Sequence, residues 1–438
     1  MSIKTKTSAT KEEAKPLSMP KLRFPAFRMS DGWALEAGDV LFEQINDRNP
    51  EPGLPVLAVT QDNGAIPRHM IDYHVSVTEK SIESYKVVRV GDFIISLRSF
   101  QGGIEYSRYH GVCSPAYVIL RRRGKGSNEY FRHYLKTDRF IRILTRNLEG
   151  LRDGKMISYA QFSELMLPVP KPAEQQKVAE CLSSVDELIT AQAQKVDALK
   201  THKKGLMQQL FPCGGETQPR VRLPEFRKAG EWARMSIQEM IDQQFIVGHL
   251  DGNHGELYPK AEEFSKNKEG IPYITANDFI SGSVDFSRCK RLPIERARLF
   301  KKGVAKDGDI LFAHNATVGP VAKLSTSEEF VILSTTATYF RCNDKYLSND
   351  FLKSSLSSPD FVAQYSRVMS QSTRDQVPIT TQRRLELQVP KLPEQQRIAS
   401  CLSSLDAQIT DETRKIEALK THKKGLMQQL FPSTAEEK

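Results

Sequence analysis

Apolar residues recur at heptad spacing in two long stretches of the chain, which lie between Pro172 and Pro212 and between Pro393 and Pro432. In each stretch the first and fourth heptad positions stay largely apolar over about five heptads, which is typical of a coiled-coil helix. The apolar seam positions are Val178, Leu182, Val185, Ile189, Val196, Leu199, Leu206 and Leu210, then Ile398, Leu402, Leu405, Ile409, Ile416, Leu419, Leu426 and Leu430. Each stretch therefore predicts one helix of about 37 residues, roughly 55 Å long at 1.5 Å per residue.

The two stretches are near-copies of each other. Residues 169–212 and 389–432 agree at 30 of 44 positions without a gap, and both end in KTHKKGLMQQLFP. A second match links PKLRFPAFRMSDGW at 20–33 with PRVRLPEFRKAGEW at 219–232. Self-similarity of this length indicates an internal duplication. Each half of the chain therefore consists of an opening segment, a globular domain and a long helix.

Polar residues interrupt both seams at equivalent positions, with Gln192 and Lys203 in the first copy and Glu412 and Lys423 in the second. A single amphipathic helix cannot bury its stripe alone, so the two helices are expected to pack on each other. A pseudo-twofold pair runs antiparallel, which places Val178 near Leu430 and brings Gln192 and Glu412 together near the middle, where polar residues fix register. The alternative is two separate amphipathic helices, each packed on its own domain.

The segments between opening segment and helix share little identity but a common order of features. Residues 88–107 and 304–322 each carry a Gly-Asp turn, an apolar β run and a glycine-containing loop, and 111–121 and 331–341 are rich in β-formers. Helical stretches follow at 129–144 and 348–368, the latter interrupted by Pro359, and strand-like segments at 165–169 and 385–389 lead into the long helices. The pattern predicts two α+β domains, each built on a twisted, mostly antiparallel sheet.

These features give a division of the chain by residue number. We expect a disordered tail at 1–19, a first globular domain at 20–168 and a first long helix at 169–212. A linker and the second domain follow at 213–388, then the second helix at 389–432 and a tail at 433–438. The near-identical helices perform one task twice, whereas the divergent domains perform related tasks on different targets.

Composition narrows the class of partner and the compartment. The net charge of +10 and a pI near 9.1 favour a polyanionic partner, although 63 basic and 53 acidic residues make charge alone only indicative. The six cysteines are scattered and form no CxxC pair, in keeping with a reducing cytoplasm. Mean hydropathy is −0.45, and neither a membrane-length apolar run nor a secretory signal is present. A soluble cytoplasmic protein is expected.

Motifs for catalysis are missing from the sequence. There is no GxxxxGK[ST] loop, no GxGxxG after a strand and no HExxH or paired Cys/His spacing. The nearest string to the Asn-Pro-Pro-aromatic tetrad of a base-flipping methyltransferase is Asn49-Pro50-Glu51-Pro52, which lacks the adjacent proline and the aromatic residue. The segment 251–259, DGNHGELYP, brings Asp251, Asn253 and His254 together, and we favour a structural or DNA-facing loop over a metal or catalytic site.

Several segments instead carry side chains suited to nucleic acid. Arg and Gln make bidentate contacts to guanine and adenine edges, glycines permit close backbone approach, and basic clusters contact phosphates. The predicted DNA-contact residues of the first half are Arg98, Ser99, Gln101, Gly102, Arg121, Arg122, Arg123 and Arg152. Those of the second half are Asn253, His254, Arg288, Lys290, Arg291, His314, Asn315, Thr317 and Arg374. For each residue the alternative is an ordinary solvated charge or a simple turn.

Two variable domains, each followed by a repeated helix, resemble the specificity subunit of type I restriction–modification enzymes. The likeness spans residues 20–432 and rests on the PKLRFP and PRVRLP openings, the SPAYVILR segment, and the VPKPAEQQK and VPKLPEQQR junctions before the helices. One departure is that no short tandem repeats lie within the helix, so a spacer length cannot be counted.

The resemblance implies a function in bacterial defence. Each variable domain is then a target recognition domain for one half of a bipartite, asymmetric DNA site, and the paired helices form the spacer and dock two modification (methyltransferase) subunits. The resemblance implies no catalytic group and no cofactor or metal on this chain. AdoMet belongs to the methyltransferase subunits, and ATP and Mg²⁺ belong to the restriction subunits. The alternatives are a coiled-coil scaffold without sequence readout, or a self-contained DNA methyltransferase or nuclease.

Overall fold

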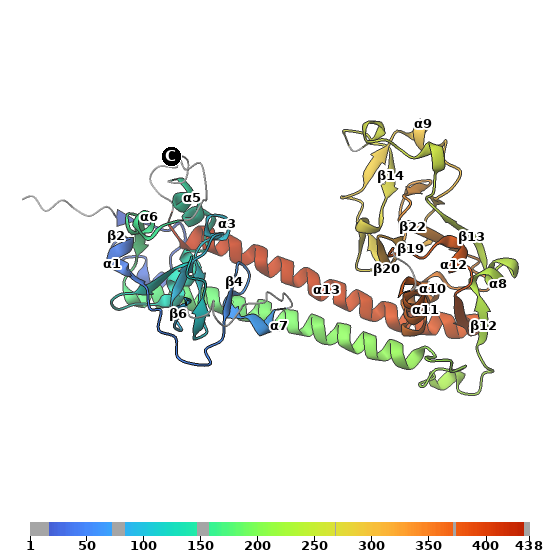
Figure 1. The fold of residues 1–438 in the computed structure, drawn as a ribbon, viewed down its shortest axis with the longest axis horizontal. Helices are drawn as coiled ribbons and strands as arrows, with labels where there is room; N and C mark the ends of the chain where they lie inside the picture. The colour runs from blue at the N-terminus through green and yellow to red at the C-terminus, as the bar shows by residue number, and fades with distance from the viewer. Residues whose placement is uncertain (1–16, 72–83, 147–156, 268, 371–373, 433–438) are drawn as a thin grey trace, which may run out of the picture. The chain divides into compact units, whose positions relative to one another are not determined.

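The structure is a computed structural model that describes residues 17–71, 84–146, 157–267, 269–370 and 374–432 (Figure 1). The chain divides into two compact units. Unit 1 combines residues 1–191 with 416–438, and unit 2 comprises residues 192–415. Each unit therefore holds one globular domain together with a part of each long helix.

Unit 1 carries a mixture of short strands and helices. Its strands are β1 (Leu17–Ser18), β2 (Trp33–Ala37), β3 (Phe42–Ile45), β4 (Leu57–Thr60), β5 (Gly64–Pro67), β6 (Lys86–Val88), β7 (Phe93–Ile95), β8 (Glu105–Tyr106), β9 (Gly111–Cys113), β10 (Val118–Arg122) and β11 (Met166–Val169). Its short helices are α1 (Gly38–Leu41), α3 (Ser99–Gly102), α4 (Asn128–Tyr134), α5 (Asp138–Arg146) and α6 (Tyr159–Ser163). The strands form sheets in the orders β1-β2-β11, β3-β10-β7-β8, β4-β5 and β6-β9.

Unit 2 is built in a related way with larger sheets. Its strands are β12 (Ala233–Ser236), β13 (Ile246–Asp251), β14 (Ile271–Ile274), β15 (Phe279–Ile280), β16 (Ser283–Val284), β17 (Lys290–Leu292), β18 (Val304–Ala305), β19 (Ile310–Asn315), β20 (Thr317–Lys323), β21 (Val331–Leu333), β22 (Ala337–Cys342) and β23 (Glu386–Val389). Its short helices are α8 (Ile237–Asp242), α9 (Ile294–Ala297), α10 (Asn349–Leu356), α11 (Pro359–Ser370) and α12 (Ile379–Gln382). The sheet orders are β13-β22-β19-β20-β16-β15, β17-β14-β21-β18 and β12-β23.

The predicted α+β class with mostly antiparallel pairing is confirmed, but the prediction of one sheet per domain is wrong. Among the described strands, β14 with β21 and β16 with β20 pair in parallel, and the other strand pairs are antiparallel. The β-rich stretches at 111–121 and 331–341 are each split into two strands, which lie in different sheets. Because these strands are only three to six residues long, each domain folds around several small sheets.

The helical stretches are also split in both halves. The predicted interruption at Pro359 is confirmed, since α10 ends at Leu356 and α11 begins at Pro359, and the first half breaks at the corresponding point between α4 and α5. Thr137 and Ser358 cap the second helix of each pair, accepting the backbone N–H of Phe140 at 3.1 Å and of Phe361 at 3.4 Å. Despite their low identity, the two domains therefore share a pair of consecutive helices separated by a capped turn.

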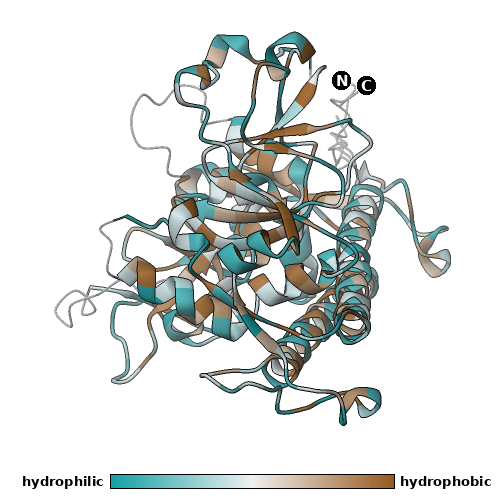
Figure 2. Cartoon of the chain, turned by 90° about the vertical axis from the view of Figure 1, so that its right-hand side faces the viewer, coloured by the Kyte–Doolittle hydropathy of each residue, from teal (hydrophilic) through white to brown (hydrophobic). Residues whose placement is uncertain are grey.

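The long helices are α7 (Pro172–Leu210) and α13 (Leu392–Leu430), each of 39 residues. All sixteen apolar seam residues are buried or half-buried, and Figure 2 shows helices that carry both polar and apolar positions. In unit 1, Val178 and Leu182 belong to the same buried cluster as Leu430. In unit 2, Leu210 and Ile398 share a cluster. In both units the first turns of one helix thus lie with the last turns of the other, and the predicted neighbourhood of Val178 and Leu430 is confirmed.

Three smaller observations complete the fold. Most of the tail predicted at 1–19 lies outside the described residues, as does the tail at 433–438, but Leu17–Ser18 form a strand paired with β2. The six cysteines are free, and Cys181 and Cys401 are half-buried. Across the part of the chain that the structure describes, no helix has both the length and the apolar character needed to cross a bilayer.

Candidate nucleic-acid interface and helix junctions

The duplicated opening segment joins the ends of the two long helices in each unit. In unit 1 the guanidinium of Arg23 makes a bidentate pair with Glu174 in the first turn of α7, with both distances 2.7 Å. The same guanidinium donates to the carbonyls of Ser30 and Asp31, and the next-door Leu22 N–H donates to the Gln429 carbonyl at the end of α13 (2.9 Å). The opening segment therefore satisfies a carbonyl that the helix terminus leaves without an intrahelical partner.

Unit 2 repeats this junction. Arg222 pairs with Glu394 through two contacts of 2.7 Å, and the Val221 N–H donates to the Gln209 carbonyl at 3.0 Å. Trp232 adds a hydrogen bond from its indole N–H to Glu394. The side chains of both ion pairs are at most 9 % exposed. Identical residues thus recur in the two halves because each half builds the same buried junction.

The glutamine that follows this glutamate fixes each domain to its helix. Gln175 donates to the Pro170 carbonyl and accepts the Ser127 N–H, which precedes α4. In unit 2, Gln395 does the same with Pro390 and Ser348. The EQQ motif at each helix start is therefore structural: one side chain anchors the opening segment and the next anchors the domain.

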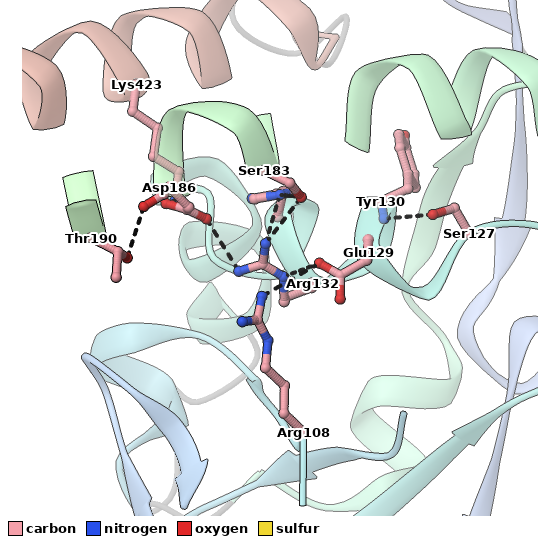
Figure 3. A network of polar contacts seen from close by, with 10 residues as sticks. Arg108, Ser127, Glu129, Tyr130, Arg132, Ser183, Asp186, Thr190 and Lys423 are labelled. Carbon is pink, nitrogen blue, oxygen red and sulfur yellow. Dashed lines mark hydrogen bonds and ion pairs between the residues drawn. The ribbon is translucent and has the colours of Figure 1, made fainter. Parts of the chain in front are cut away.

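At a few seam positions a charged residue stands where an apolar one is expected, and each such residue forms an ion pair. In unit 1, Lys423 pairs with Asp186 at 2.6 Å, and Asp186 also accepts from Arg132, which in turn binds Glu129 (Figure 3). The network includes Arg108 and Ser183, and Ser127 caps α4 by accepting the Tyr130 N–H (Figure 3).

Unit 2 contains the equivalent pair, Lys203 with Asp406, at 2.5 Å. Glu412 accepts from Gln192 and Lys195 there, which confirms the predicted neighbourhood of Gln192 and Glu412. The hydrogen bond from Lys195, followed by those from Lys415 and Gln192, lowers the pKa of Glu412 to about 2, so the carboxylate stays charged at neutral pH. The polar interruptions of the seam are therefore paired.

The first candidate base-contacting loop is the turn around α3. Arg98 and Gln101 are exposed on it, whereas Ser99 is buried and accepts the Ser96 N–H at 2.8 Å. Gly103 has φ +82°, and a Cβ there would lie 2.2 Å from the Leu135 carbonyl oxygen. The close approach that we predicted for this Gly-Gly pair is thus to the end of α4, which fixes the turn and leaves Arg98 and Gln101 presented to solvent.

Lys136 stabilises the backbone of this turn. Its ammonium donates to the carbonyls of Gly102 and Gln61, each at 3.0 Å, and to the buried carboxylate of Glu105 at 2.5 Å. Burial raises the pKa of Glu105 to about 7, while Lys136 opposes the rise. The sequence search missed both residues, because a lysine and a glutamate 31 positions apart carry no local signal.

The second candidate loop is the tip of the β19–β20 hairpin. Asn315 is half-exposed and Thr317 exposed, on either side of Ala316, whose φ of +63° is strained for a residue with a Cβ. The Ala316 N–H donates to the Asp375 carbonyl at 3.0 Å. Two predicted segments, 314–317 and 374–375, are therefore brought together, whereas His314 is buried within the hairpin.

The predicted phosphate clusters divide into engaged and exposed residues. Arg121 makes a bidentate pair with buried Asp92, as Arg341 does with Asp309. In each half, the aspartate of the Gly-Asp turn therefore binds an arginine of a neighbouring strand. Arg291 pairs with Glu328 at 3.0 Å. Placement of the other members is as follows: Arg122 lies over Phe131, Lys290 lies over Phe264, Arg123 and Arg288 are exposed, and Arg152 lies outside the described residues.

The Asp251–His254 loop is structural in its geometry. His254 is buried, its Nε2 lies 2.7 Å from the Leu333 carbonyl oxygen, and its ring packs on Phe300 at 4.3 Å. Asn253 is exposed beside it. No group of three or more His, Cys, Asp or Glu side chains is placed to hold a metal ion in the described parts of the chain.

A buried histidine predicts acid sensitivity of unit 1. Burial, reinforced by Arg132, Lys423 and Arg108, lowers the pKa of His133 to about 2. The unfolded side chain, with a pKa near 6.5, binds its proton first as the pH falls, so unfolding is favoured below about pH 6.5. We expect His133 to cost unit 1 about 1.4 kcal/mol of unfolding free energy per pH unit from about pH 6 to 4. Urea unfolding at stepped pH, followed by Trp33 fluorescence in a W232F background, measures this.

The control variant is His133→Gln, which cannot titrate in this range. Its unfolding free energy is expected to vary less steeply between pH 6.5 and 4.5 than that of the parent. Equal slopes for the two proteins contradict the assignment.

The sequence is similar to known proteins over most of its length. A profile described as "Type I restriction modification DNA specificity domain" matches residues 34–201 and again residues 247–421. The chain belongs to this family and carries its domain twice.

Two curated relatives of this family member are specificity subunits. The type I restriction enzyme MjaVIII specificity subunit of Methanocaldococcus jannaschii is 24 % identical over 82 % of this chain and 81 % of its own. The putative MjaX specificity subunit of the same organism is 23 % identical over 86 % of each chain.

Solved structures share the fold of this family member. A chain from work on complex assembly and conformational transition of the type I restriction–modification system covers 92 % of this chain and 98 % of its own (TM-score 0.53, 16 % identity). The type I system S subunit from M. genitalium covers 95 % of this chain and all of its own (TM-score 0.52, 15 % identity). The specificity-domain fold therefore extends over nearly the whole chain.

Proposed function

We propose that this chain is the non-catalytic specificity subunit of a type I restriction–modification complex. The observation that carries the proposal is the double match to the DNA specificity domain, with one match in each half of the duplicated chain. Each domain, within residues 20–168 and 213–388, reads one half of a bipartite, asymmetric DNA site. The chain itself performs no chemistry: methylation belongs to its modification subunits, and ATP-driven cleavage belongs to its restriction subunits.

In this proposal, exposed side chains on two loops whose backbone is held in place read the DNA sequence. In the first domain Arg98 and Gln101 lie on a turn held by Lys136, and in the second Asn315 and Thr317 flank a strained hairpin tip. Side chains on rigid supports lose little freedom on binding, and base contacts of this kind set the sequence. The exposed cations Arg123 and Arg288 supply phosphate contacts, which fix position without sequence.

The two long helices are assigned to spacing and assembly. We infer that residues 169–212 and 389–432 form an antiparallel coiled coil, the spacer between the recognition domains and the docking element for two modification subunits. Paired polar residues along the seam, Lys423 with Asp186 and Lys203 with Asp406, support this because each pair selects one register.

A domain exchange tests the proposal directly. Residues 20–168 are replaced by the first domain of another member of the family, and both proteins are expressed with their cognate modification subunits. Mapping methylated adenines in the host genome is expected to show that one half of the recognition sequence changes and the other half stays. Loss of all methylation by a folded chimera, or a change in both halves, contradicts independent readout by the two domains. Unchanged sites would favour a scaffold without readout.

A further inference from the structure

A basic cavity of about 420 Å³ lies in unit 1, where the last turns of α13 meet the start of α5. The domain contributes Lys21, Lys136, Arg139 and Arg142 to its wall, and α13 contributes Lys420, Lys423 and Lys424. Asp138 is the one carboxylate among the lining residues, and Glu105, Asp186 and Glu417, which lie outside the lining, pair with Lys136, Lys423 and Lys420. This volume falls within the range of small-molecule sites.

Several of these cations are held in place by neighbours. Lys136 is fixed by Glu105 and two carbonyls, and Lys423 is fixed by Asp186. Lys424 pairs with Asp138 at 3.0 Å, but both side chains are more than half exposed, so this pair contributes little and can open. Arg142 and Lys420 are also exposed. The cavity therefore combines a fixed basic wall with Lys424, an exposed cation whose ion pair can open toward a ligand.

The duplicated half provides an internal comparison for the cavity. The helix-end lysines Lys420, Lys423 and Lys424 have identical counterparts 220 positions earlier, in the second half's own junction. Thr137 and Ser358 occupy matching capping positions, which sets the alignment of the two helix pairs. In that alignment the basic residues of the first half at 136, 139 and 142 correspond to a serine, an aspartate and an alanine at 357, 360 and 363.

The matching positions of unit 2 do not supply these three cations. A hollow lined by Phe211, Ser358 and Asp360 has a volume of only about 10 Å³. Shared ancestry explains the frame and the helix-end lysines, but it does not explain the three additional cations of the first half. The charge of this cavity is therefore a property of the first half.

We propose that the cavity binds a multiply charged phosphate anion, such as the polyphosphate chain of a nucleotide or consecutive phosphates of a nucleic-acid strand. Linked phosphates present several negative charges within one small volume, which suits a cavity lined by cations from both the domain and α13. Arginine holds phosphate oxygens through two parallel N–H donors, and lysine holds them as a point charge. This site is separate from the recognition loops and goes beyond the proposed function, which assigns nothing to the cavity.

The test uses inorganic tripolyphosphate as the probe and the full chain as the protein. Calorimetric titration at low salt is expected to show one saturable site. Arg142→Ala, which introduces the residue found at the matching position of unit 2, and Lys424→Ala are each expected to weaken binding about tenfold or more, with salt dependence reduced. Lys204→Ala alters the same KTHKKG motif in unit 2 and is expected to leave binding within about twofold.

Two further measurements complete the test. Lys420→Ala provides a third exposed variant, and circular dichroism of each variant checks that it is folded. A duplex oligonucleotide added to the loaded protein identifies the source of the phosphate: displacement of tripolyphosphate assigns the site to a DNA strand, and simultaneous binding assigns it to a free polyphosphate. Absence of saturable binding, or equal weakening by Lys204→Ala and Lys424→Ala, overturns the proposal.

Discussion

Replacing Arg23 with Met is expected to lower the unfolding free energy of unit 1 by about 3–5 kcal/mol. The substitution leaves the Glu174 carboxylate, which is 1 % exposed, buried without its cation. It also removes the donors to the Ser30 and Asp31 carbonyls that hold the opening segment. The chain has two tryptophans, Trp33 in unit 1 and Trp232 in unit 2, so Trp33 fluorescence in a W232F background reports unit 1 by itself.

Three controls separate the buried pair from general effects. The double variant Arg23→Met with Glu174→Met is expected to recover much of the loss, because no charge then remains buried. Lys171→Met, which breaks an exposed pair with Asp31 at 3.6 Å, is expected to cost under about 0.5 kcal/mol. Arg222→Met tests the duplicate junction through Trp232 in a W33F background. A loss below about 1 kcal/mol for Arg23→Met contradicts the assigned role.

Replacing Arg98 with Ala is expected to affect recognition of one half of the DNA site only. A side chain that makes a good bidentate base contact contributes about 1–3 kcal/mol of discrimination, so methylation of the parent half-site should fall about tenfold to 100-fold relative to a sequence altered at the contacted base. The assay follows methylation by the complex with its modification subunits, on duplexes that carry one altered base pair in either half-site.

The matched variant is Asn315→Ala on the hairpin tip of unit 2. It is expected to relax recognition of the other half-site and to spare the half that Arg98 affects. Arg123→Ala serves as a phosphate-contact control, which should weaken all duplexes uniformly and reduce the salt dependence. Equal relaxation of both halves by Arg98→Ala contradicts separate readout by the two domains.

The long-range architecture was predictable because it is repetitive. Heptad spacing and the 220-residue self-match predicted two long helices, since periodicity sums many weak preferences over about 37 residues, and the turn and β-strand pattern of the domains predicted the α+β class. The structure has 39 residues in each helix, with Gln192 bound to Glu412 as expected. The division of each domain into several small sheets was missed, because strand pairing is set by contacts distant in sequence.

The candidate site was predictable only as a set of loops. Arg98 and Arg121 look alike in sequence, as arginines beside β runs. Arg98 is exposed on a turn, whereas Arg121 is bound to a buried aspartate 29 positions away. His314 and Thr317 lie on one hairpin, yet β pairing buries the first and exposes the second. Exposure decides whether such a residue can reach DNA, and exposure depends on the whole domain.

The sequence by itself determined the duplication, the two helices and the family, because each is a pattern repeated along the chain. Only the tertiary structure decided which charges are used internally and which face solvent. Buried carboxylates form ion pairs with Arg23, Arg222 and Arg121. One cavity instead brings together cations from segments almost 400 residues apart, at 21, 139, 142, 420, 423 and 424. The physical reason is that a buried charge needs its counter-charge within a few ångströms, and chain folding, not sequence proximity, supplies it.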